Sequence, residues 1–519
     1  MLESSSVDVD TAAPAGNLTA TLQSEITELR ARVESRDQRI RLLEEALRVL
    51  NSNKYGPSRE RLSVAAGQNE LFNEAEVIME LSEATGVEPE LKATLCAKRR
   101  SARESRVEPS WPPTWRGSMC AMSCRSPGTL VEIGADSSEQ IDFIPAKVQV
   151  LHHLRIKYAC SGCQLCIKSA PLPAHILPKA NASPGLLAYL VTSKYADSLP
   201  LYRLEKMLER QEVRVPRSTQ ALWMIALTLP LQPLLNLMDE RLRGSGYVRI
   251  DETRLQVLQS DKAPSALHWM WMWVRMAGAK HQRIILFDYN PGRSGAVADA
   301  LMEGCSGYLQ SDGYRVYVGA SARADLIHVG CFAHCRRRFF EALKALPKEV
   351  RKRDTAAYEG VRRIDELYLI EREIKECSDE ERTRIRRERA VPLLGSLYEW
   401  ATRLQHETIP SGKLGDALGY LVKQWPKLCR YVDDPRLAMD TNLAENAIRP
   451  FALGRRNWLY ADTVKGAKAS AALYSIVSAA RANGLEPYAY LKHLFTELPK
   501  AQTVEDFEAL LPFKNPAST

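Results

Sequence analysis

The chain has 519 residues, too many for one hydrophobic core, and we expect roughly three or four domains. Hydrophobic residues make up 45% and charged residues 26% of the sequence, which is the composition of an ordinary soluble protein. The net charge of +8 permits a polyanionic partner but, at this length, does not demand one. A run of about 18 apolar residues and a secretory signal are both lacking, which predicts a cytoplasmic protein without a membrane span.

The N-terminal region carries a heptad repeat. Residues 1–20 are polar, and we expect them to form a disordered tail. Over residues 21–51, apolar side chains fill eight of the nine seam positions from Leu22 to Leu50, with Arg36 as the exception. The pattern predicts a coiled coil (a leucine zipper) through which copies of the chain self-associate. An amphipathic helix packed on its own chain is the alternative.

Residues 52–128 predict a basic linker with short helices. Its second part, residues 91–128, is rich in Arg, Ser, Pro, Trp and Cys and has neither a helical nor a strand period. This composition also resembles a GC-rich coding sequence read out of frame. A local frameshift is therefore a second interpretation of this segment.

A cysteine-rich stretch brackets the next expected module, a zinc-finger-like β module at residues 129–170. The segment LVEIGADSSEQIDFIPAKVQVLHHLRIKYAC alternates like paired strands. Five of the eleven cysteines fall between positions 120 and 166, and in a chain without a signal peptide such clustering favours a metal site over disulfides. The candidate zinc ligands are Cys120, Cys124, Cys160 and Cys163, in a Cys-x3-Cys and a Cys-x2-Cys pair.

Residues 171–235 predict two helices separated by the turn QEVRVPRS, with Ser218 or Thr219 capping the second. This outline fits a DNA-binding helix-turn-helix in which Arg217 contacts DNA. A plain helical hairpin is the alternative.

Five short strand-like runs follow, within an expected core at residues 236–345. Asp251 lies inside the first run, Asp312 ends the fourth just before Gly313, and both are flanked by apolar residues. A carboxylate at such a buried position is costly unless it is paired or bound to a metal. If the first three strands form a meander and the fourth lies beside the first, these two acids are neighbours. Glu252 and Asp288 compete, but Glu252 faces the other side of the strand from Asp251.

Residues 346–436 are charged and helical in period, and we expect a helical insertion there. At residues 437–462 a helix capped by Asp440, Thr441 or Asn442 would carry Glu445, and residues 463–519 predict a helical C-terminal domain. Basic and aromatic side chains surround this acid and suit a DNA backbone or a frayed DNA end. The candidate DNA contacts are Arg337, Arg449, Arg455, Arg456 and Trp458. A charged helix with a core Trp is the alternative.

Three carboxylates on strands and a helix suit one kind of chemistry. Asp251, Asp312 and Glu445 could together hold two Mg²⁺ ions, which prefer hard oxygen ligands and stabilise the attacking and leaving oxygens of a phosphodiester reaction.

Six segments, in this order, resemble the transposases of the insertion sequence sixty-six family. They are SEQIDFIPAKVQVLHHLRIKYACSGC, LLAYLVTSKYADSLPLYRLEKMLERQEVRVPRST, IDET, LQSDGY, CFAHCRRRFF and DTNLAENAIRPFALGRRNWLYA. The resemblance covers about residues 129–500 closely, and more loosely the heptad region and the KYGPSRERL segment. One departure is CAMSCRSPGTLVEIG, because the family pattern has a tight Cys-x2-Cys pair there.

The resemblance implies a multidomain bacterial DDE transposase with a ribonuclease-H-like α/β core interrupted by a helical insertion. It implies that Asp251, Asp312 and Glu445 are the catalytic and Mg²⁺-binding triad. It also implies an N-terminal leucine zipper, a zinc-binding module and a helix-turn-helix for terminal inverted repeats.

The expected activity is Mg²⁺- or Mn²⁺-dependent cleavage at transposon ends, followed by transfer of the 3′-hydroxyl into target DNA. We expect a homo-oligomer formed through the coiled coil, and accessory proteins of the same element are further candidate partners. A catalytically inactive DNA-binding accessory or regulatory protein is one alternative. A nuclease of the same fold without strand transfer is the other.

Overall fold

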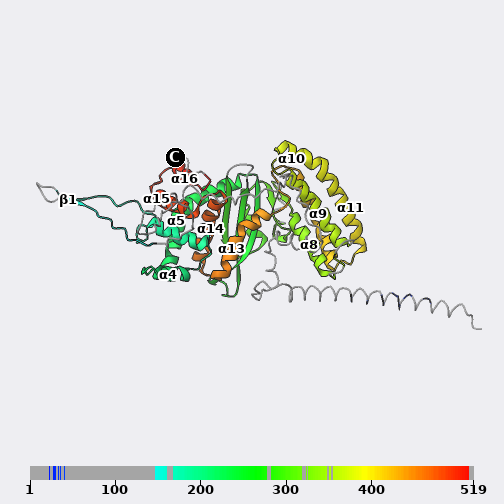
Figure 1. The fold of residues 1–519 in the computed structure, drawn as a ribbon, viewed down its shortest axis with the longest axis horizontal. Coiled ribbons are helices and arrows are strands. Elements are labelled where there is room, and N and C mark those ends of the chain that lie inside the picture. Colours follow the sequence, from blue (N-terminus) through cyan, green and yellow to red (C-terminus); the bar gives the residue numbers. More distant parts are fainter. Residues whose placement is uncertain are drawn as a thin grey trace, which may run out of the picture. The chain divides into compact units, whose positions relative to one another are not determined.

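The computed structural model describes residues 147–159 and 167–513, with short gaps at 277–281, 318, 320–322, 324, 348–349 and 352–354, and seven single residues between 23 and 40. Most of the predicted coiled coil, the linker and all four candidate zinc ligands lie outside the described residues. The chain divides into two compact units, one of which is Val87–His152. Everything below concerns the other unit, and within it the residues from 153 onward unless stated otherwise (Figure 1).

The first described elements are a short strand pair and three helices. Strands β1 (Lys157–Ala159) and β2 (Ile167–Ser169) pair antiparallel. The helices are α3 (Pro184–Tyr195), α4 (Leu201–Glu209) and α5 (Arg217–Arg243). Helix α3 begins with Pro184 after Ser183, whose hydroxyl accepts a hydrogen bond from the Leu186 amide at 3.2 Å, and both features favour a helix start.

Helix α5 is, by length and composition alone, apolar enough to cross a membrane, although polar residues interrupt its apolar stretch. Its buried residues, Leu227, Leu231, Leu234, Met238 and Leu242, recur at helical spacing and form one face. The helix packs against α14, β5 and α4 within the folded unit. We therefore interpret α5 as a core helix.

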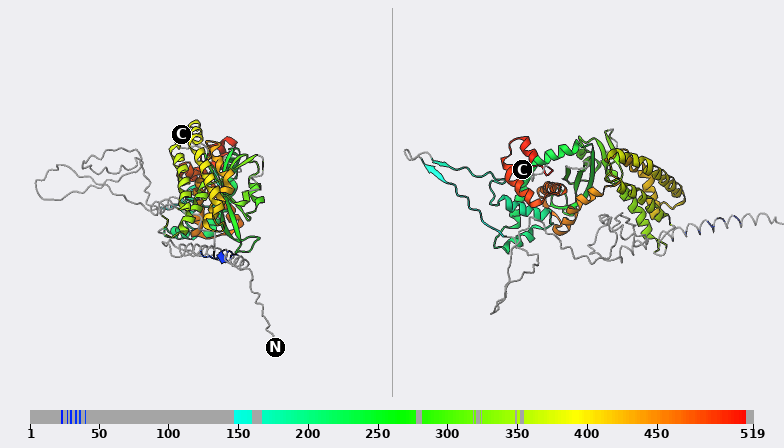
Figure 2. Two further views of the ribbon diagram at one scale, coloured as in Figure 1. Left: turned by 90° about the vertical axis from the view of Figure 1, so that its right-hand side faces the viewer. Right: turned by 45° about the horizontal axis from the view of Figure 1, so that its top comes forward.

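The centre of the unit is a mixed six-stranded sheet (Figures 1 and 2). Five strands follow the order β5-β4-β3-β6-β7, and the sixth, β8, pairs with β3. Strands β3, β4 and β5 form an antiparallel meander, whereas β6 and β7 run parallel to β3. The strands are β3 (Tyr247–Gln259), β4 (Leu267–Met276), β5 (Arg283–Asn290), β6 (Gly307–Gln310), β7 (Leu326–Val329) and β8 (Ala461–Thr463). The fourth strand of the sheet therefore lies beside the first, the condition under which Asp251 and Asp312 become neighbours.

Helices α13 (Asn442–Trp458) and α14 (Val464–Ala482) pack on the sheet face that carries Asp251. Asp251 pairs in register with Met272, and Met272 pairs with Phe287, so all three side chains project to this face. The ring of Phe287 stacks on Phe451 of α13, with 6.1 Å between centroids. On the opposite face, Trp271 contacts Tyr317 of the short helix η1 (Arg315–Tyr317), which follows α6 (Gly295–Leu301) and β6 in the chain.

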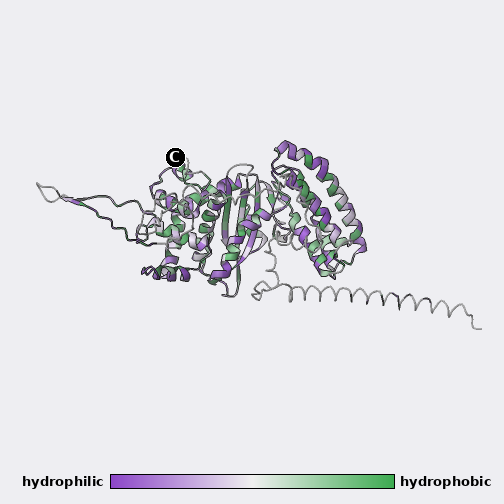
Figure 3. Cartoon of the chain, viewed as in Figure 1, coloured by the Kyte–Doolittle hydropathy of each residue, from purple (hydrophilic) through white to green (hydrophobic). Residues whose placement is uncertain are grey.

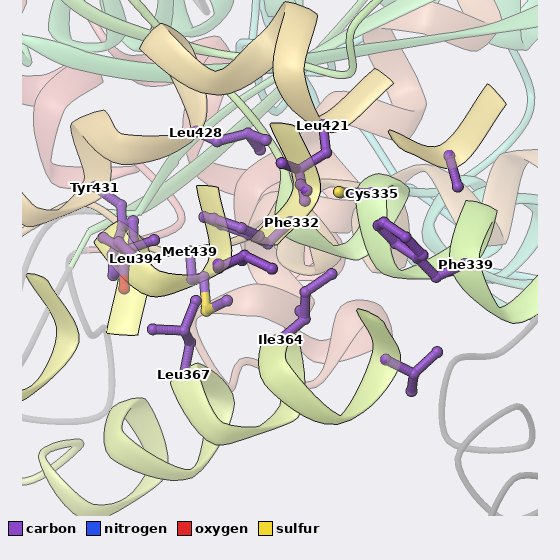
Figure 4. Close-up of a cluster of buried hydrophobic side chains, with 14 of the residues drawn as sticks. Phe332, Cys335, Phe339, Ile364, Leu367, Leu394, Leu421, Leu428, Tyr431 and Met439 are labelled. Carbon is purple, nitrogen blue, oxygen red and sulfur yellow. The ribbon is translucent and has the colours of Figure 1, made fainter. Parts of the chain in front are cut away.

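A helical region separates β7 from α13 in the chain. It consists of α8 (Phe332–Ala345), α9 (Ala356–Glu373), α10 (Asp379–Ile385), the π-helical turn η2 (Arg386–Ala390), α11 (Val391–Glu407), α12 (Lys413–Leu428) and η3 (Cys429–Val432). Its core is apolar, with Phe332, Phe339, Ile364, Leu394 and Leu421 among the packed side chains (Figure 4). In Figure 3 these helices mix hydrophilic and hydrophobic residues, whereas the strands of the sheet are mainly hydrophobic.

Arg386 ties this helical region to the segment that leads into α13. Its side chain is 2% exposed and forms a bidentate ion pair with Glu371 of α9, at 2.9 and 2.7 Å. It also donates to the carbonyls of Tyr431, Asp434 and Leu437 at 2.8–3.0 Å. Because Arg386 bonds both to the Glu371 carboxylate of α9 and to three backbone carbonyls that precede α13, it fixes that segment relative to α9.

The C-terminal helices close the unit. Helices α15 (Pro487–Glu497), η4 (Leu498–Lys500) and α16 (Val504–Ala509) end the described chain. Helix α15 packs on α3, and α16 contacts α5, where Arg241 pairs with Glu508.

Two helical glycines test the packing of the helical region. A Cβ atom on Gly360 of α9 would overlap the ring of Phe339, whereas a Cβ on Gly395 of α11 meets no atom within 4 Å. We expect Gly360→Ala to destabilise the protein by about 1–2 kcal/mol, because overpacking outweighs the gain in helix propensity. Gly395→Ala should stabilise it by up to about 1 kcal/mol. Chemical denaturation of both variants checks this; equal shifts of the same sign would contradict it.

Candidate active site

The register of the sheet places Asp251 and Asp312 side by side. Strands β3 and β6 pair Tyr247 with Tyr308 and Arg249 with Gln310, an offset of 61 residues (308 − 247). The two acids are separated by the same 61 residues (312 − 251). Asp312 lies two residues beyond the end of β6, so the same offset brings it to the level of Asp251, and the two carboxylates interact electrostatically.

Glu445 reaches the same face from the first turn of α13, which packs on β3 and β4. The buried Thr441, at the N-cap, donates from its hydroxyl to Glu445 Oε1 at 3.4 Å and to Cys331 Sγ at 3.2 Å. A carboxylate in the first turn is favoured by the positive end of the helix dipole. The contact to Cys331 also joins the start of α13 to the start of α8.

The three acids form one electrostatic cluster. Burial, together with the negative charges of Glu252, Asp312 and Glu445, raises the pKa of Asp251 well above its usual value. A hydrogen bond of 2.8 Å from the amide of Glu252 to Asp251 Oδ1 opposes this shift only in part. A nearby cation would therefore stabilise the ionised form of Asp251.

Two basic side chains of α8 approach Glu445. His334 Nδ1 lies 3.7 Å from Glu445 Oε1, and an Arg337 guanidinium nitrogen lies 3.6 Å from Oε2. Both distances exceed those of strong hydrogen bonds, and the Arg337 guanidinium partly offsets the charge of Glu445.

The two competing acids have other roles in the fold. Glu252 is 2% exposed, forms an ion pair with Arg293 and accepts a hydrogen bond from the Tyr317 hydroxyl. The pKa of Asp288 is raised by burial, and the charges that act on it come from Lys468, Asp239 and Arg243. Glu252 is therefore committed to partners, and Asp288 lies outside the electrostatic cluster.

The turn that carries Asp312 is held from several sides. The Tyr314 amide donates to Asp312 Oδ1 at 3.1 Å, and the Ser311 hydroxyl is 2.8 Å from His328 Nε2. A Cβ atom on Gly313 would lie 2.8 Å from the ring of Tyr420 in α12, so the helical region touches this turn directly. Only glycine permits that approach.

A buried hydrogen-bond network lies on the two strands next to the acids. Arg249 Nε donates to the Tyr247 hydroxyl at 2.8 Å and to Gln310 Oε1 at 3.1 Å. The Gln310 amide donates to the carbonyls of Ala438 at 2.8 Å and Gly330 at 3.2 Å. Reasoning from the sequence missed this network. Its signal was the polar residue two positions before each acid, Arg249 and Gln310, in otherwise apolar strands.

The type of donor atom in these acids suits a divalent cation. In the described part of the chain, no group of three or more His, Cys, Asp or Glu side chains stands ready to hold a metal ion. Three carboxylates are nevertheless the hard oxygen donors that Mg²⁺ and Mn²⁺ prefer, and the pKa of Asp251 is raised by burial and by the neighbouring negative charges. The donor set therefore fits such an ion by its chemistry.

The predicted DNA contacts differ in their surroundings. Arg455 is half-buried and donates to the carbonyl of Arg254 and to the Thr253 hydroxyl, so it joins α13 to β3. Trp458 packs edge-on against Phe451, with 5.4 Å between centroids.

The remaining predicted arginines are less constrained. Arg217 and Arg456 are exposed and Arg449 is half-buried, and none of the three has a hydrogen bond or ion pair to another described residue. Arg337 lies beside Glu445, as given above.

Comparison with protein families gives three matches. Residues 179–469 match the model described as "Transposase IS66 family", and residues 475–513 match the "IS66 C-terminal element". Residues 122–164 match the "zinc-finger binding domain of transposase IS66". The last match includes Cys124, Cys160 and Cys163 but not Cys120.

Three curated relatives come from Sinorhizobium fredii (strain NBRC 101917 / NGR234). Uncharacterized protein y4qI is 30% identical over 512 residues, covering 95% of this chain and 92% of the relative. Uncharacterized protein y4hP is 27% identical over 467 residues, covering 86% and 84%. Uncharacterized protein y4jD is 30% identical over 403 residues, covering 76% and 78%.

The raised pKa of Asp251 predicts a pH-dependent gain from neutralising it. A carboxyl whose pKa is raised by folding destabilises the folded state when ionised, and the penalty disappears as the pH falls below its unfolded value of about 3.9. Asp251→Asn should therefore raise the melting temperature near pH 7 in EDTA, with the gain shrinking toward pH 4. Mn²⁺ should stabilise the wild type more than the variant.

Asp261→Asn is the matched control, since Asp261 is exposed between β3 and β4. Equal melting temperatures of the wild type and Asp251→Asn at neutral pH would contradict the electrostatic cluster.

Proposed function

The chain belongs to the IS66 transposase family, and from this premise we propose that it is a DDE transposase that cuts DNA at the ends of a mobile element and joins them to target DNA. The observation that carries the proposal is the convergence of Asp251, Asp312 and Glu445 in one electrostatic cluster. All three lie within the span that the family model matches.

The sheet supports a ribonuclease-H-like core. An antiparallel three-strand meander continued by two parallel strands beside the first gives the order β5-β4-β3-β6-β7. Asp251 on β3, Asp312 after β6 and Glu445 on α13 then form the catalytic triad, with the helical region as an insertion before Glu445.

Each residue has a part in this chemistry. Asp251, Asp312 and Glu445 would hold Mg²⁺ or Mn²⁺, which supplies Lewis-acid stabilisation of the attacking and leaving oxygens. Arg337 and His334, at the edge of the same cluster, are placed to meet the negative charge of the phosphodiester. The fixed Asp312 turn and the Thr441 contact keep the carboxylates in place.

Two reactions would follow at this site. Hydrolysis at the element's end releases a 3′-hydroxyl, and that hydroxyl then attacks a phosphodiester of the target and displaces its 3′ oxygen. Both are in-line displacements on phosphorus, so one set of carboxylates serves both.

DNA binding is assigned to three parts of the chain. Residues 122–164 match a zinc-finger domain, and Zn²⁺ held by Cys124, Cys160 and Cys163 with a fourth ligand such as Cys120 would order it. Helices α4 and α5 form a helix-turn-helix with Arg217 at the start of the second helix. Arg449 and Arg456 extend a basic surface along α13.

Self-association is assigned to residues 21–51. Leu29, Val33 and Ile40 are helical and more than half exposed, and they occupy seam positions of the heptad. An apolar seam of this kind is stable when it packs on a second copy. Such an enzyme would act in the bacterial cytoplasm, on the nucleoid, with or without accessory proteins of its element.

One observation favours the second candidate, an inactive DNA-binding accessory protein. Among the described residues no group of ligands stands ready for a metal. Metal-dependent nicking of end DNA separates the two candidates, and joined products separate a transposase from a plain nuclease.

The catalytic assignment predicts a large loss on neutralising an acid. Asp251→Asn or Asp312→Asn should lower Mg²⁺-dependent nicking and joining of labelled end DNA by about 1000-fold or more, since metal-bound oxygens contribute several kcal/mol to such reactions. Asp416→Asn, an exposed acid on α12, should leave both rates unchanged. Wild-type rates for either active-site variant would refute the triad.

Substitution of two arginines of α13, Arg455 and Arg456, should have different effects on DNA binding and stability. Arg456→Ala should weaken DNA binding and reduce the slope of log K against log salt by about 0.9, because one phosphate contact is lost. Arg455→Ala should instead lower the melting temperature, since its bond to the Arg254 carbonyl is lost, and keep the wild-type salt slope. Fluorescence anisotropy across a salt series and thermal unfolding measure both, and an unchanged slope for Arg456→Ala would contradict a phosphate contact.

A further inference from the structure

Three side chains form a layered stack next to the Asp312 turn. The guanidinium carbon of Arg293, in the loop after β5, lies 4.4 Å from the ring centroid of Trp269 on β4. It lies 3.7 Å from the ring centroid of Tyr314. The stack thus alternates an aromatic ring, a planar cation and a second aromatic ring.

The cation in the middle of this stack is paired with a buried carboxylate. Arg293 pairs through Nε with Glu252 Oε1 at 2.8 Å and through a second nitrogen with the same oxygen. Glu252 is 2% exposed, so the charge of Arg293 neutralises a buried carboxylate. Arg293 is therefore a poor group for binding phosphate, and it acts as a rigid spacer that fixes the ring of Tyr314.

Tyr314 is the outer layer, and it is attached to the acid cluster. Its amide donates to Asp312 Oδ1 at 3.1 Å, while its side chain is 36% exposed. The Tyr314 hydroxyl has no hydrogen-bond partner among the described residues. A large ring with an exposed surface is thus held two residues from a proposed catalytic carboxylate.

We propose that Tyr314 is a stacking platform for an unpaired nucleobase beside the phosphodiester that the acid cluster acts on. The inference rests on the proposed function, because it names how that site holds its DNA. Every base offers a π face, and stacking on an aromatic side chain contributes about 1–3 kcal/mol per base. A ring that is already immobilised by Arg293 loses little entropy when the base arrives.

The platform suits an unpaired base and not a duplex. Stacking on Tyr314 requires one face of the base to be free, which holds at a frayed or nicked end. It leaves phosphate binding to the arginines of α8 and α13. The subsite is therefore expected to distinguish tailed from fully paired DNA without reading the sequence.

The test uses the full chain in EDTA, so that binding is measured without cleavage. The probes are a duplex from the element's end with a short unpaired overhang carrying 2-aminopurine, and the same duplex fully paired. The wild type should quench 2-aminopurine in the overhang, because stacking on an aromatic ring quenches its fluorescence. Tyr314→Ala should abolish the quench and weaken binding of the tailed duplex by roughly 5- to 100-fold.

Other variants separate stacking from structure. Tyr314→Phe should behave as the wild type, and Tyr314→Leu, which keeps apolar bulk, should lose the quench. Arg293→Lys should give a partial quench, since lysine keeps the charge but not the planar stack. Tyr398→Ala is the matched control, because Tyr398 on α11 is also 36% exposed and stacks on Trp425; it should bind both probes normally.

Each contrary outcome has a distinct meaning. Wild-type quenching and affinity in Tyr314→Ala and Tyr314→Leu would overturn the inference alone, as would equal losses on tailed and paired DNA. Binding of the wild type without any quench would overturn it as well. If the wild type binds neither probe, the proposed function fails and the inference with it.

Discussion

The fold must satisfy one constraint: several carboxylates lie close together in a partly buried site, and their charges must be compensated. The negative charges of Glu252, Asp312 and Glu445 act on the buried Asp251, and burial together with these charges raises its pKa. Each neighbouring element supplies part of the compensation: Arg293 pairs with Glu252, the start of α13 favours Glu445, and backbone amides donate to Asp251 and Asp312. The pKa of Asp251 nevertheless stays raised, so a bound cation would stabilise its ionised form.

The helical region has a physical reason to lie between β7 and α13. It contacts the Asp312 turn through Tyr420, which approaches Gly313, and through Arg386 it holds the carbonyls that precede α13. The Gln310 amide, bonded to Ala438, connects the same segment to the sheet. The position of Glu445 is therefore set by contacts on both sides of the chain, from the strands and from the helices.

Much of the sheet could be predicted from the sequence, because strands with apolar flanks and interspersed acids leave a local signal. The offset of 61 residues between β3 and β6 could not, since it depends on which strands pair. The pairing of Glu252 with Arg293, 41 residues away, could not be predicted locally. The same holds for the bond from Arg455 to the carbonyl of Arg254 on β3, 201 residues away. Arg455 and Trp458 carried the same basic-aromatic signal as Arg456, yet only tertiary packing separates them. Helix α5 shows the converse: its apolar length is visible locally, but its partner α14 is not.

In the proposed site, recognition of DNA and catalysis would depend on one short segment. Residues 310–317 supply the Gln310 network, the Asp312 carboxylate, the exposed ring of Tyr314 and the Tyr317 hydroxyl on Glu252. The Tyr314 amide donates to Asp312, so a contact that moved Tyr314 would also act on the Asp312 carboxylate. Because Arg293 joins Glu252 to Tyr314, the same displacement also reaches the strand that carries Asp251. A base seated on Tyr314 would thereby stabilise the turn in which Asp312 faces Asp251, so that binding of an unpaired end and readiness of the carboxylates are coupled through direct contacts.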